Sequence, residues 1–178
     1  MMTAVEFVQI EVKRLHKMLD GTLSGITPEQ LHAVPADHPK ANTIAWGLFH
    51  CVRTEDNVVR FVLQDRRPTV WMEGGYADRL GLPPVAQGTG MTVADAQALR
   101  IKDLELFREY MQKVWASTED LCSKAEPAFF DKMVTVKPLG EMPAVRALGQ
   151  IVASHGMMHV GQMELVRTLV GAAPVVNV

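Results

Sequence analysis

Four long segments of the chain repeat their apolar residues every three or four positions, and this period restricts the fold to packed helices. The segments cover about residues 3–19, 42–64, 92–126 and 143–171. The first of them carries Val5, Val8, Val12, Leu15 and Leu19. Apolar residues at these spacings share one face of a helix and must be buried against other helices. The pattern predicts an all-α, four-helix bundle.

Capping signals predict where the helices begin and end. Thr27, Pro28 and Gln30 form a capping box that opens a short extra helix before the second long one. Asn42 is the expected N-cap of the second helix. Thr92, with Asp95 three residues on, opens the third, which we expect to continue unbroken for about 30 residues.

Two stretches between the helices have no helical period. Residues 65–91, rich in Gly and Pro, form a long connection between the second and third helices. Connections of this length in small domains are usually functional or mobile. Residues 131–142 favour an extended backbone for a few positions, too few to predict a sheet.

Composition limits the classes of function. A chain of 178 residues fits one domain, residues 1–178, and a net charge of −2 gives no basic face for nucleic acid. No apolar run approaches the 18 residues that a membrane span needs, and the N-terminus does not resemble a signal peptide. The two cysteines, Cys51 and Cys122, follow no metal or disulfide spacing. We therefore expect a soluble, reduced, cytoplasmic protein with no membrane partner.

The chain contains six histidines: His16, His32, His38, His50, His155 and His159. His155 and His159 stand four positions apart in SHGMMHVGQ, so a helix places them on one face. Such a pair arises by chance in roughly one chain of this composition in five. The pair alone leaves two alternatives, namely core histidines with hydrogen-bond partners or two ligands of a metal ion.

A metal would need a third ligand from another helix. His50 is the candidate, because it lies in the middle of the second helix, where a histidine gains nothing from helix propensity. His16, among Lys13, Arg14 and Lys17, is expected at a solvated position, and His32 and His38 lie in connecting sequence. Three imidazoles leave coordination positions open to water or substrate and favour zinc or nickel over magnesium or calcium.

The two histidine motifs resemble those of the DinB/YfiT-like superfamily. NTIAWGLFHCVRTED contains Trp46-x-x-x-His50, and SHGMMHVGQMELVRTLVG contains a His-x-x-x-His-x-Gly-Gln motif from His155 to Gln162. Members of the family resemble four-helix bundles with a divalent metal held by three histidines, and the match covers the whole chain in element order. Two positions depart from the family pattern, Gly156 and Val160, so the resemblance does not extend to substrate contacts.

The resemblance implies a metal-dependent enzyme that acts on a small molecule. Characterised relatives use low-molecular-weight thiols as S-transferases or isomerases, and several are homodimers. We therefore expect a thiol-dependent transferase or a hydrolase, with His50, His155 and His159 as metal ligands. We also expect the protein to form a homodimer. The alternative is a non-catalytic metal-binding or small-molecule-binding protein of the same fold, for example in a stress response; an unmetallated structural bundle is a third. No acid, base or nucleophile can be assigned from the sequence.

The sequence also gives expectations for other residues near the motifs, some with a functional and a structural alternative. Gln162 either orients a ligand imidazole or serves helix packing, and Asn57 lies on the face of His50. Glu55 and Asp56 are expected on a solvated face, and Cys51 as a small buried apolar residue. Trp71 and Tyr76 either cover the site or, preferably, anchor the long connection. Met157 and Met158 are expected in the core.

Overall fold

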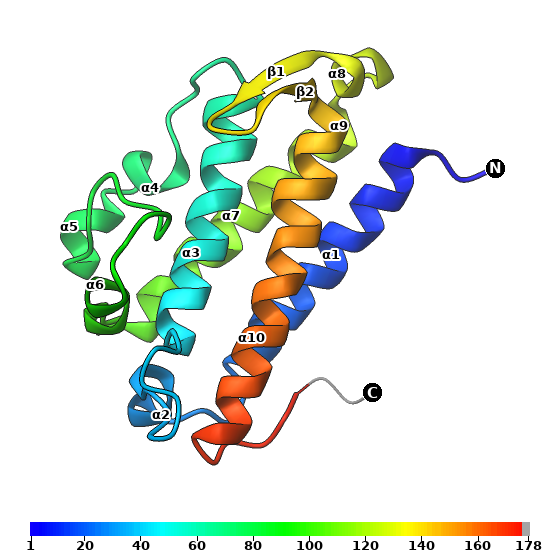
Figure 1. Cartoon of the computed structure of the whole chain (residues 1–178). Helices are drawn as coiled ribbons and strands as arrows, with labels where there is room; N and C mark the ends of the chain where they lie inside the picture. The colour runs from blue at the N-terminus through cyan, green and yellow to red at the C-terminus, as the bar shows by residue number, and fades with distance from the viewer. Residues whose placement is uncertain (176–178) are drawn as a thin grey trace.

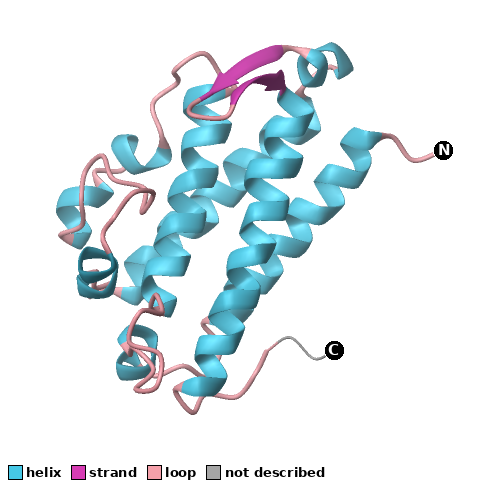
Figure 2. Ribbon diagram, in the orientation of Figure 1, coloured by secondary structure: helices cyan, strands magenta, loops and turns pink. Residues whose placement is uncertain are grey.

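The computed structural model describes residues 1–175 and shows a bundle of four long helices (Figures 1 and 2). These are α1 (Ala4–Thr22), α3 (Ile44–Asp56) continued by the π-helical η1 (Asn57–Val62), α7 (Leu104–Lys124), and α9 (Ala144–Arg146) continued by the π-helical η2 (Ala147–Ser154) and α10 (His155–Leu169). The all-α bundle predicted from the apolar period is confirmed. No helix within residues 1–175 has both the length and the apolar character needed to cross a membrane.

The helices form a closed ring in which α1 packs on α10, α10 on α3, α3 on α7, and α7 on α1. The colour gradient in Figure 1 shows that α1 and α10 run in one direction and that α3 and α7 run in the other. Because α3 and α7 are parallel, the chain must return along the bundle between them. This return explains the long connection.

The connection is more structured than its Gly and Pro content predicts. It contains α4 (Val70–Glu73), α5 (Tyr76–Leu80) and α6 (Val93–Ala98). Asp56 anchors it to the bundle, because its buried carboxylate accepts hydrogen bonds from the backbone N–H groups of Val70 (2.8 Å) and Trp71 (2.9 Å). The Tyr110 hydroxyl donates a third, at 3.0 Å.

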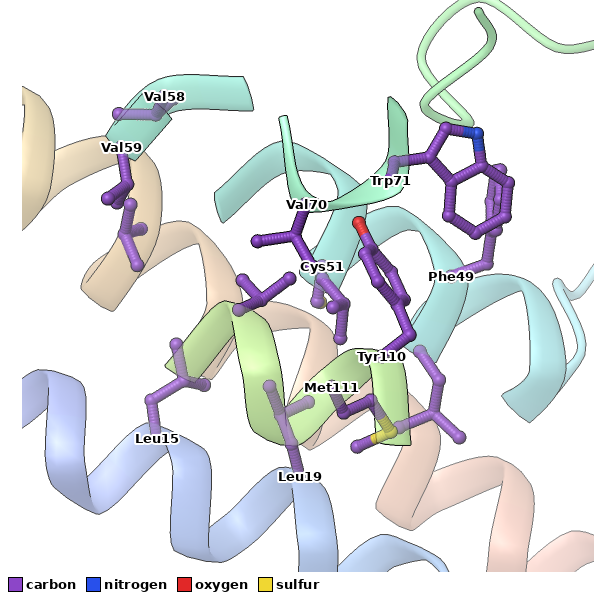
Figure 3. Packing of buried hydrophobic residues seen from close by; sticks show 14 of the residues in the cluster. Leu15, Leu19, Phe49, Cys51, Val58, Val59, Val70, Trp71, Tyr110 and Met111 are labelled. Carbon is purple, nitrogen blue, oxygen red and sulfur yellow. The ribbon is translucent and has the colours of Figure 1, made fainter. Parts of the chain in front are cut away.

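α3 is enclosed on every side, since every residue from Ile44 to Asp56 is buried. Figure 3 shows Phe49 and Cys51 of this helix packed near Trp71 of the connection and Tyr110 and Met111 of α7, with Leu15 and Leu19 of α1 beneath. Trp71 and Tyr76 are 1% and 0% exposed, so they anchor the connection and do not form a lid. Cys51 is buried as predicted.

Three boundary predictions are corrected. The helix expected to run unbroken from residue 92 stops at Ala98 and restarts at Leu104, where the side chain of Asp103 accepts a hydrogen bond from Leu106 N–H. The N-cap of α3 is Thr43, one residue after Asn42. Residues 131–142 do include a sheet, the hairpin of β1 (Met133–Val136) and β2 (Gly140–Pro143), which covers the end of the bundle.

The short helix α2 (Pro28–His32) begins with the predicted capping box of Thr27 and Gln30. The remaining short helix, α8 (Pro127–Asp131), follows α7. Thr92 caps α6 as predicted. Gly171, with φ +79°, follows the last helix.

Candidate metal centre

Two neighbouring helices bring three histidines together in the middle of the bundle. His50 comes from α3, and His155 and His159 from α10. The Nε2 atom of His155 lies 3.1 Å from that of His50 and 3.1 Å from that of His159. His50 and His159 are buried, and His155 is partly exposed. The structure therefore assembles the three residues predicted from the two sequence motifs.

Small residues let the histidine helices approach their neighbours. A side chain at Gly47 would overlap Met163, so α3 and α10 are close at this level. A side chain at Gly156 would overlap Leu15 of α1 in the same way. Gly156, which departs from the family pattern, is thus explained by the contact between α1 and α10.

The outer nitrogens of the three rings are held by oxygen acceptors. The Nδ1 atom of His50 donates to the backbone carbonyl of Gln87 at 2.6 Å. The Nδ1 atom of His159 donates to Oε1 of Gln162 at 2.7 Å. His155 is hydrogen-bonded to the backbone carbonyl of Ile151. Gln162 therefore orients a ring of the cluster, the first of its two predicted roles.

These bonds determine which nitrogens carry protons. A carbonyl oxygen only accepts, so Nδ1 of His50 and of His159 must carry the proton of the neutral ring, and Nε2 of each keeps a lone pair. One Nε2 proton on His155 could not satisfy both 3.1 Å contacts. In at least one of the two contacts, the lone pairs of the two Nε2 atoms would then face each other with no proton between them. A cation among the three nitrogens removes this repulsion, so the residues fit a divalent metal.

The electrostatic environment keeps the rings neutral. Burial lowers the pKa of His155 to about 4, and the neighbouring His159 and His50 contribute in the same direction. Burial also lowers the pKa of His50 and of His159, although the hydrogen bonds to Gln87 and Gln162 oppose the shift. Neutral imidazole is the form that binds a metal.

Trp46 and Gly88 fix the position of the His50 ring. The Trp46 indole stacks on it, with centroids 4.9 Å apart and planes at 17°. On another side, a Cβ placed on Gly88 would lie 2.9 Å from Cβ of His50. Gly88 has φ +90°, so both its backbone conformation and its close approach favour glycine.

One cavity adjoins the cluster, and a second lies beside Gln87, which holds the His50 ring. One, of about 260 Å³, is lined by His159 and Gln162 together with Trp46, Met163 and Val166. The other, of about 840 Å³, lies between η1, the segment 85–89 and the hairpin, and Gln87 and Asn57 line it. Asn57 therefore faces a cavity next to the site.

Three predictions about charged or sulfur-containing residues are wrong. His16, Glu55 and Asp56 are not solvated but 5%, 1% and 0% exposed. Glu55 and Asp56 lie on α3, which is enclosed on all sides, so their charges must find partners inside the bundle. His16, on α1, is buried because it is the partner of Glu55. Met158, expected in the core, is exposed, whereas Met157 packs against the core.

Glu55 and His16 form a second buried group. Nε2 of His16 lies 2.8 Å from Oε1 of Glu55, which also accepts a 2.5 Å hydrogen bond from the Thr118 hydroxyl. The group links α1, α3 and α7. In residues 1–175, the cluster that could hold a metal ion consists of His50, His155 and His159, and neither Glu55 nor a cysteine joins it.

Sequence reasoning missed Gln87 and Gly88. Gln87 acts through its backbone carbonyl, which leaves no trace in side-chain chemistry. The available signal was Gly88 itself, one of several glycines in a connection already expected to be functional. His32 and His38 are outside the site, as predicted.

Comparisons with known proteins agree with this geometry. The model of the DinB superfamily matches residues 11–163. The crystal structure of a conserved protein from Enterococcus faecalis superposes with a TM-score of 0.80, covering 96% of this chain and 98% of that chain at 17% identity. A search of curated proteins finds no match. Since the family model spans most of the residues from α1 to α10, the chain belongs to the DinB superfamily.

Proposed function

We propose that the chain is a metal-dependent enzyme in which His50, His155 and His159 hold one divalent ion, zinc or nickel. The observation that carries the proposal is the convergence of the Nε2 atoms, with that of His155 lying 3.1 Å from each of the other two, while oxygen acceptors hold the outer nitrogens of His50 and His159. Three protein ligands leave coordination positions for a molecule from solution. When bound, the ion would favour the deprotonated form of a coordinated thiol or water.

The substrate we propose is a low-molecular-weight thiol, and the reaction class S-transfer. Among residues 1–175, no carboxylate belongs to the histidine cluster that could act as a base on water. A thiol needs less help, because its pKa is about 8.5. Burial raises the pKa of Cys122 to about 11, and burial also raises that of Cys51. The chain's own thiols are therefore unreactive, which supports a thiol that comes from solution; hydrolysis is the second candidate reaction.

The chain's own groups would position the reactants. Gln87 and Gln162 hold the rings of His50 and His159 in the tautomer that presents Nε2 to the centre. The Trp46 indole stacks on the His50 ring and covers one of its faces. Holding the ligands in place before binding reduces the ordering that a bound reactant must undergo.

We also propose that the protein is a homodimer that uses the neighbouring surfaces of α1 and α10. Large apolar side chains are exposed on both helices: Phe7, Ile10, Met158, Leu165 and Leu169. Such exposure is typical of interaction surfaces when the side chains are contiguous. Light scattering after size-exclusion chromatography distinguishes a dimer from a monomer.

Metal content tests the site. Protein purified without a nickel column should contain about one zinc or nickel ion per chain by elemental analysis. His159→Ala should lose it, whereas His38→Ala, which removes an exposed histidine outside the site, should keep it. Full metal content in His159→Ala would overturn the assignment. A screen of the metal-loaded protein with thiol cosubstrates then separates an enzyme from a protein that only binds.

A further inference from the structure

The cavity of about 840 Å³ beside the centre has the size of a small-molecule site. Its walls come from three parts of the chain that are far apart in sequence: η1 with the turn after it, the segment 85–89, and the hairpin. Phe61, Val62, Val85 and Val136 supply apolar surface, and Asn57, Gln87, Thr89 and Thr135 supply polar groups. A ligand here would contact apolar surface along its length and polar groups at chosen points.

The charged residues of this cavity leave two cations without partners. Asp65, Arg66 and Lys137 line it. Asp65 is already neutralised, since both its carboxylate oxygens accept from Nζ of Lys132, at 2.9 and 3.0 Å. Within the described residues 1–175, the side chains of Arg66 and Lys137 take part in no hydrogen bond or ion pair. The cavity therefore offers two cationic side chains to an anion, one of them with the planar donor pair that matches a carboxylate.

The backbone beneath Arg66 is strained. Asp65 and Arg66 have φ +52° and +66°, the left-handed region that favours glycine. The N–H of Arg66 donates to the carbonyl of Phe61 at 2.8 Å, which holds the turn closed. Asp65 and Arg66 are consecutive non-glycine residues in this region, and both line one cavity. Backbone strain of this kind is typical of functional sites and is consistent with a turn that positions Arg66 at the cavity.

The segment 85–89 is shared by the cavity and the histidine cluster. Gln87 lines the cavity, and its carbonyl holds Nδ1 of His50 at 2.6 Å. The backbone of Gly88 approaches His50 so closely that an added Cβ would lie 3.0 Å from Nδ1 of the ring. A molecule in the cavity therefore lies against Gln87, whose carbonyl positions His50.

The cations are far from the histidines. From His50 to Val62, where η1 ends, the helix advances by at most about 18 Å, the value for an α-helical rise of 1.5 Å per residue throughout. Arg66 follows that end. A molecule that reaches both places must be long, with its anionic group remote from its reacting atom.

We propose that this cavity recognises the remote carboxylate of an elongated thiol, with Arg66 and Lys137 binding the carboxylate and the sulfur at the histidines. The proposal rests on the proposed function for the position of the sulfur. The anion site itself depends only on Arg66, Lys137 and the neutralised Asp65. It names the kind of thiol, which the histidines alone do not.

Matched thiols test the proposal on the cobalt-loaded protein, where a sulfur ligand gives a charge-transfer band. We expect 11-mercaptoundecanoate to bind about tenfold more tightly than 11-mercapto-1-undecanol, which lacks the charge. The short pair 3-mercaptopropionate and 3-mercapto-1-propanol should differ little, because the short acid cannot reach Arg66. In the double variant Arg66→Gln/Lys137→Gln, the two long thiols should bind equally, at the affinity of the alcohol.

The double variant Arg67→Gln/Lys102→Gln is the control, because it removes the same charge at exposed residues outside the cavity. It should keep the preference for the long acid. Equal binding of the long thiols to the original protein, or an unchanged preference in Arg66→Gln/Lys137→Gln, would overturn the proposal.

A second measurement separates failure of this proposal from failure of the metal site. If cobalt does not bind, the proposed function fails, and the anion site is tested by calorimetry of the metal-free protein with undecanoate and with inorganic phosphate. Undecanoate binding that is lost in Arg66→Gln/Lys137→Gln supports the carboxylate site. No binding overturns it, and tighter binding of phosphate overturns the choice of a carboxylate.

Discussion

The bundle contains two buried groups of polar side chains that include histidine, and the groups differ in what surrounds the histidine rings. Nε2 of His16 meets a carboxylate oxygen of Glu55 at 2.8 Å, and the ring stacks on Trp115 with centroids 5.0 Å apart. Among residues 1–175, the hydrogen-bond partners of the Nε2 atoms of His50, His155 and His159 are one another. Burial therefore does not distinguish a structural histidine from a ligand. What distinguishes them is the chemical group that faces the Nε2 atom of the ring.

The largest effect on stability is expected from the structural group. Glu55→Ala removes the acceptor shared by His16 and Thr118 and should lower the free energy of unfolding by about 3 kcal/mol. Metal content should not change, because Glu55 is not part of the histidine cluster. Urea denaturation and elemental analysis measure the two quantities.

Glu119→Ala is the matched control, since that carboxylate lies 3.6 Å from the other nitrogen of His16 and is about half exposed. It should cost less than about 1 kcal/mol. Loss of metal in Glu55→Ala at neutral pH, in protein that is still folded, would show that the two groups are not independent.

The histidine cluster should make the metal-free protein sensitive to acid. The folded-state pKa of His155, about 4, lies below the ordinary value of 6.5, so the unfolded chain takes up a proton first as the pH falls. Stability is full above pH 6.5 and is lost between pH 6.5 and 4, by roughly 1.4 kcal/mol per pH unit for one such residue. The lowered pKa values of His50 and His159 act in the same direction.

Urea midpoints at pH 7, 6 and 5 measure this loss. His155→Asn should flatten the dependence, and excess zinc should shift the loss to lower pH. A midpoint that does not move between pH 7 and pH 5 would contradict the buried, neutral state of the cluster.

Gly88→Ala should weaken metal binding by about 10-fold to 100-fold, because the added Cβ would displace the His50 ring. Gly90→Ala is a sharp control. Gly90 also has positive φ, +76°, but a Cβ there contacts nothing within 4 Å. Competition with a chelating dye gives both affinities. Equal losses in the two variants would assign the effect to backbone strain instead of to His50.

The smallest effect is expected from Gln162→Leu, which removes the acceptor for Nδ1 of His159 and should weaken metal binding by about 10-fold. Gln162→Glu keeps an acceptor oxygen and should retain the original affinity. The same dye competition applies. A loss of equal size in Gln162→Glu would show that the acceptor oxygen is not what Gln162 contributes to metal binding.

The sequence predicted the histidine set because each part of the signal is local. His155 and His159 are one turn apart, and Trp46 and His50 are one turn apart on another helix. The role of Gln87 could not be predicted from the sequence, since it acts through a backbone carbonyl, and every residue has one. The burial of Glu55 and Asp56 and their partners could not be predicted either, because burial on every side of α3 depends on how the four helices pack.

The fold was predictable to the level of long helices, and less so at their breaks. The interruption between Ala98 and Leu104 contains neither Gly nor Pro, so the apolar period continues through it; Asp103 was the only capping signal. The hairpin was missed because each strand has four residues, and its pairing depends on contacts that a short pattern does not encode.

The π-helical segments determine where the chain can change its length. A π turn closes its hydrogen bonds at i+5 and so holds about one residue more than an α turn. η2 ends directly before His155, and η1 begins on the helix of His50. Loss of one residue from either segment would restore α-helical geometry and keep the two parts of that helix in nearly the same rotation, whereas the same loss from an α-helical stretch would rotate one part by about 100° relative to the other. We therefore expect length changes among homologues to concentrate in the turns of the long connection and, within the long helices, in η1 and η2.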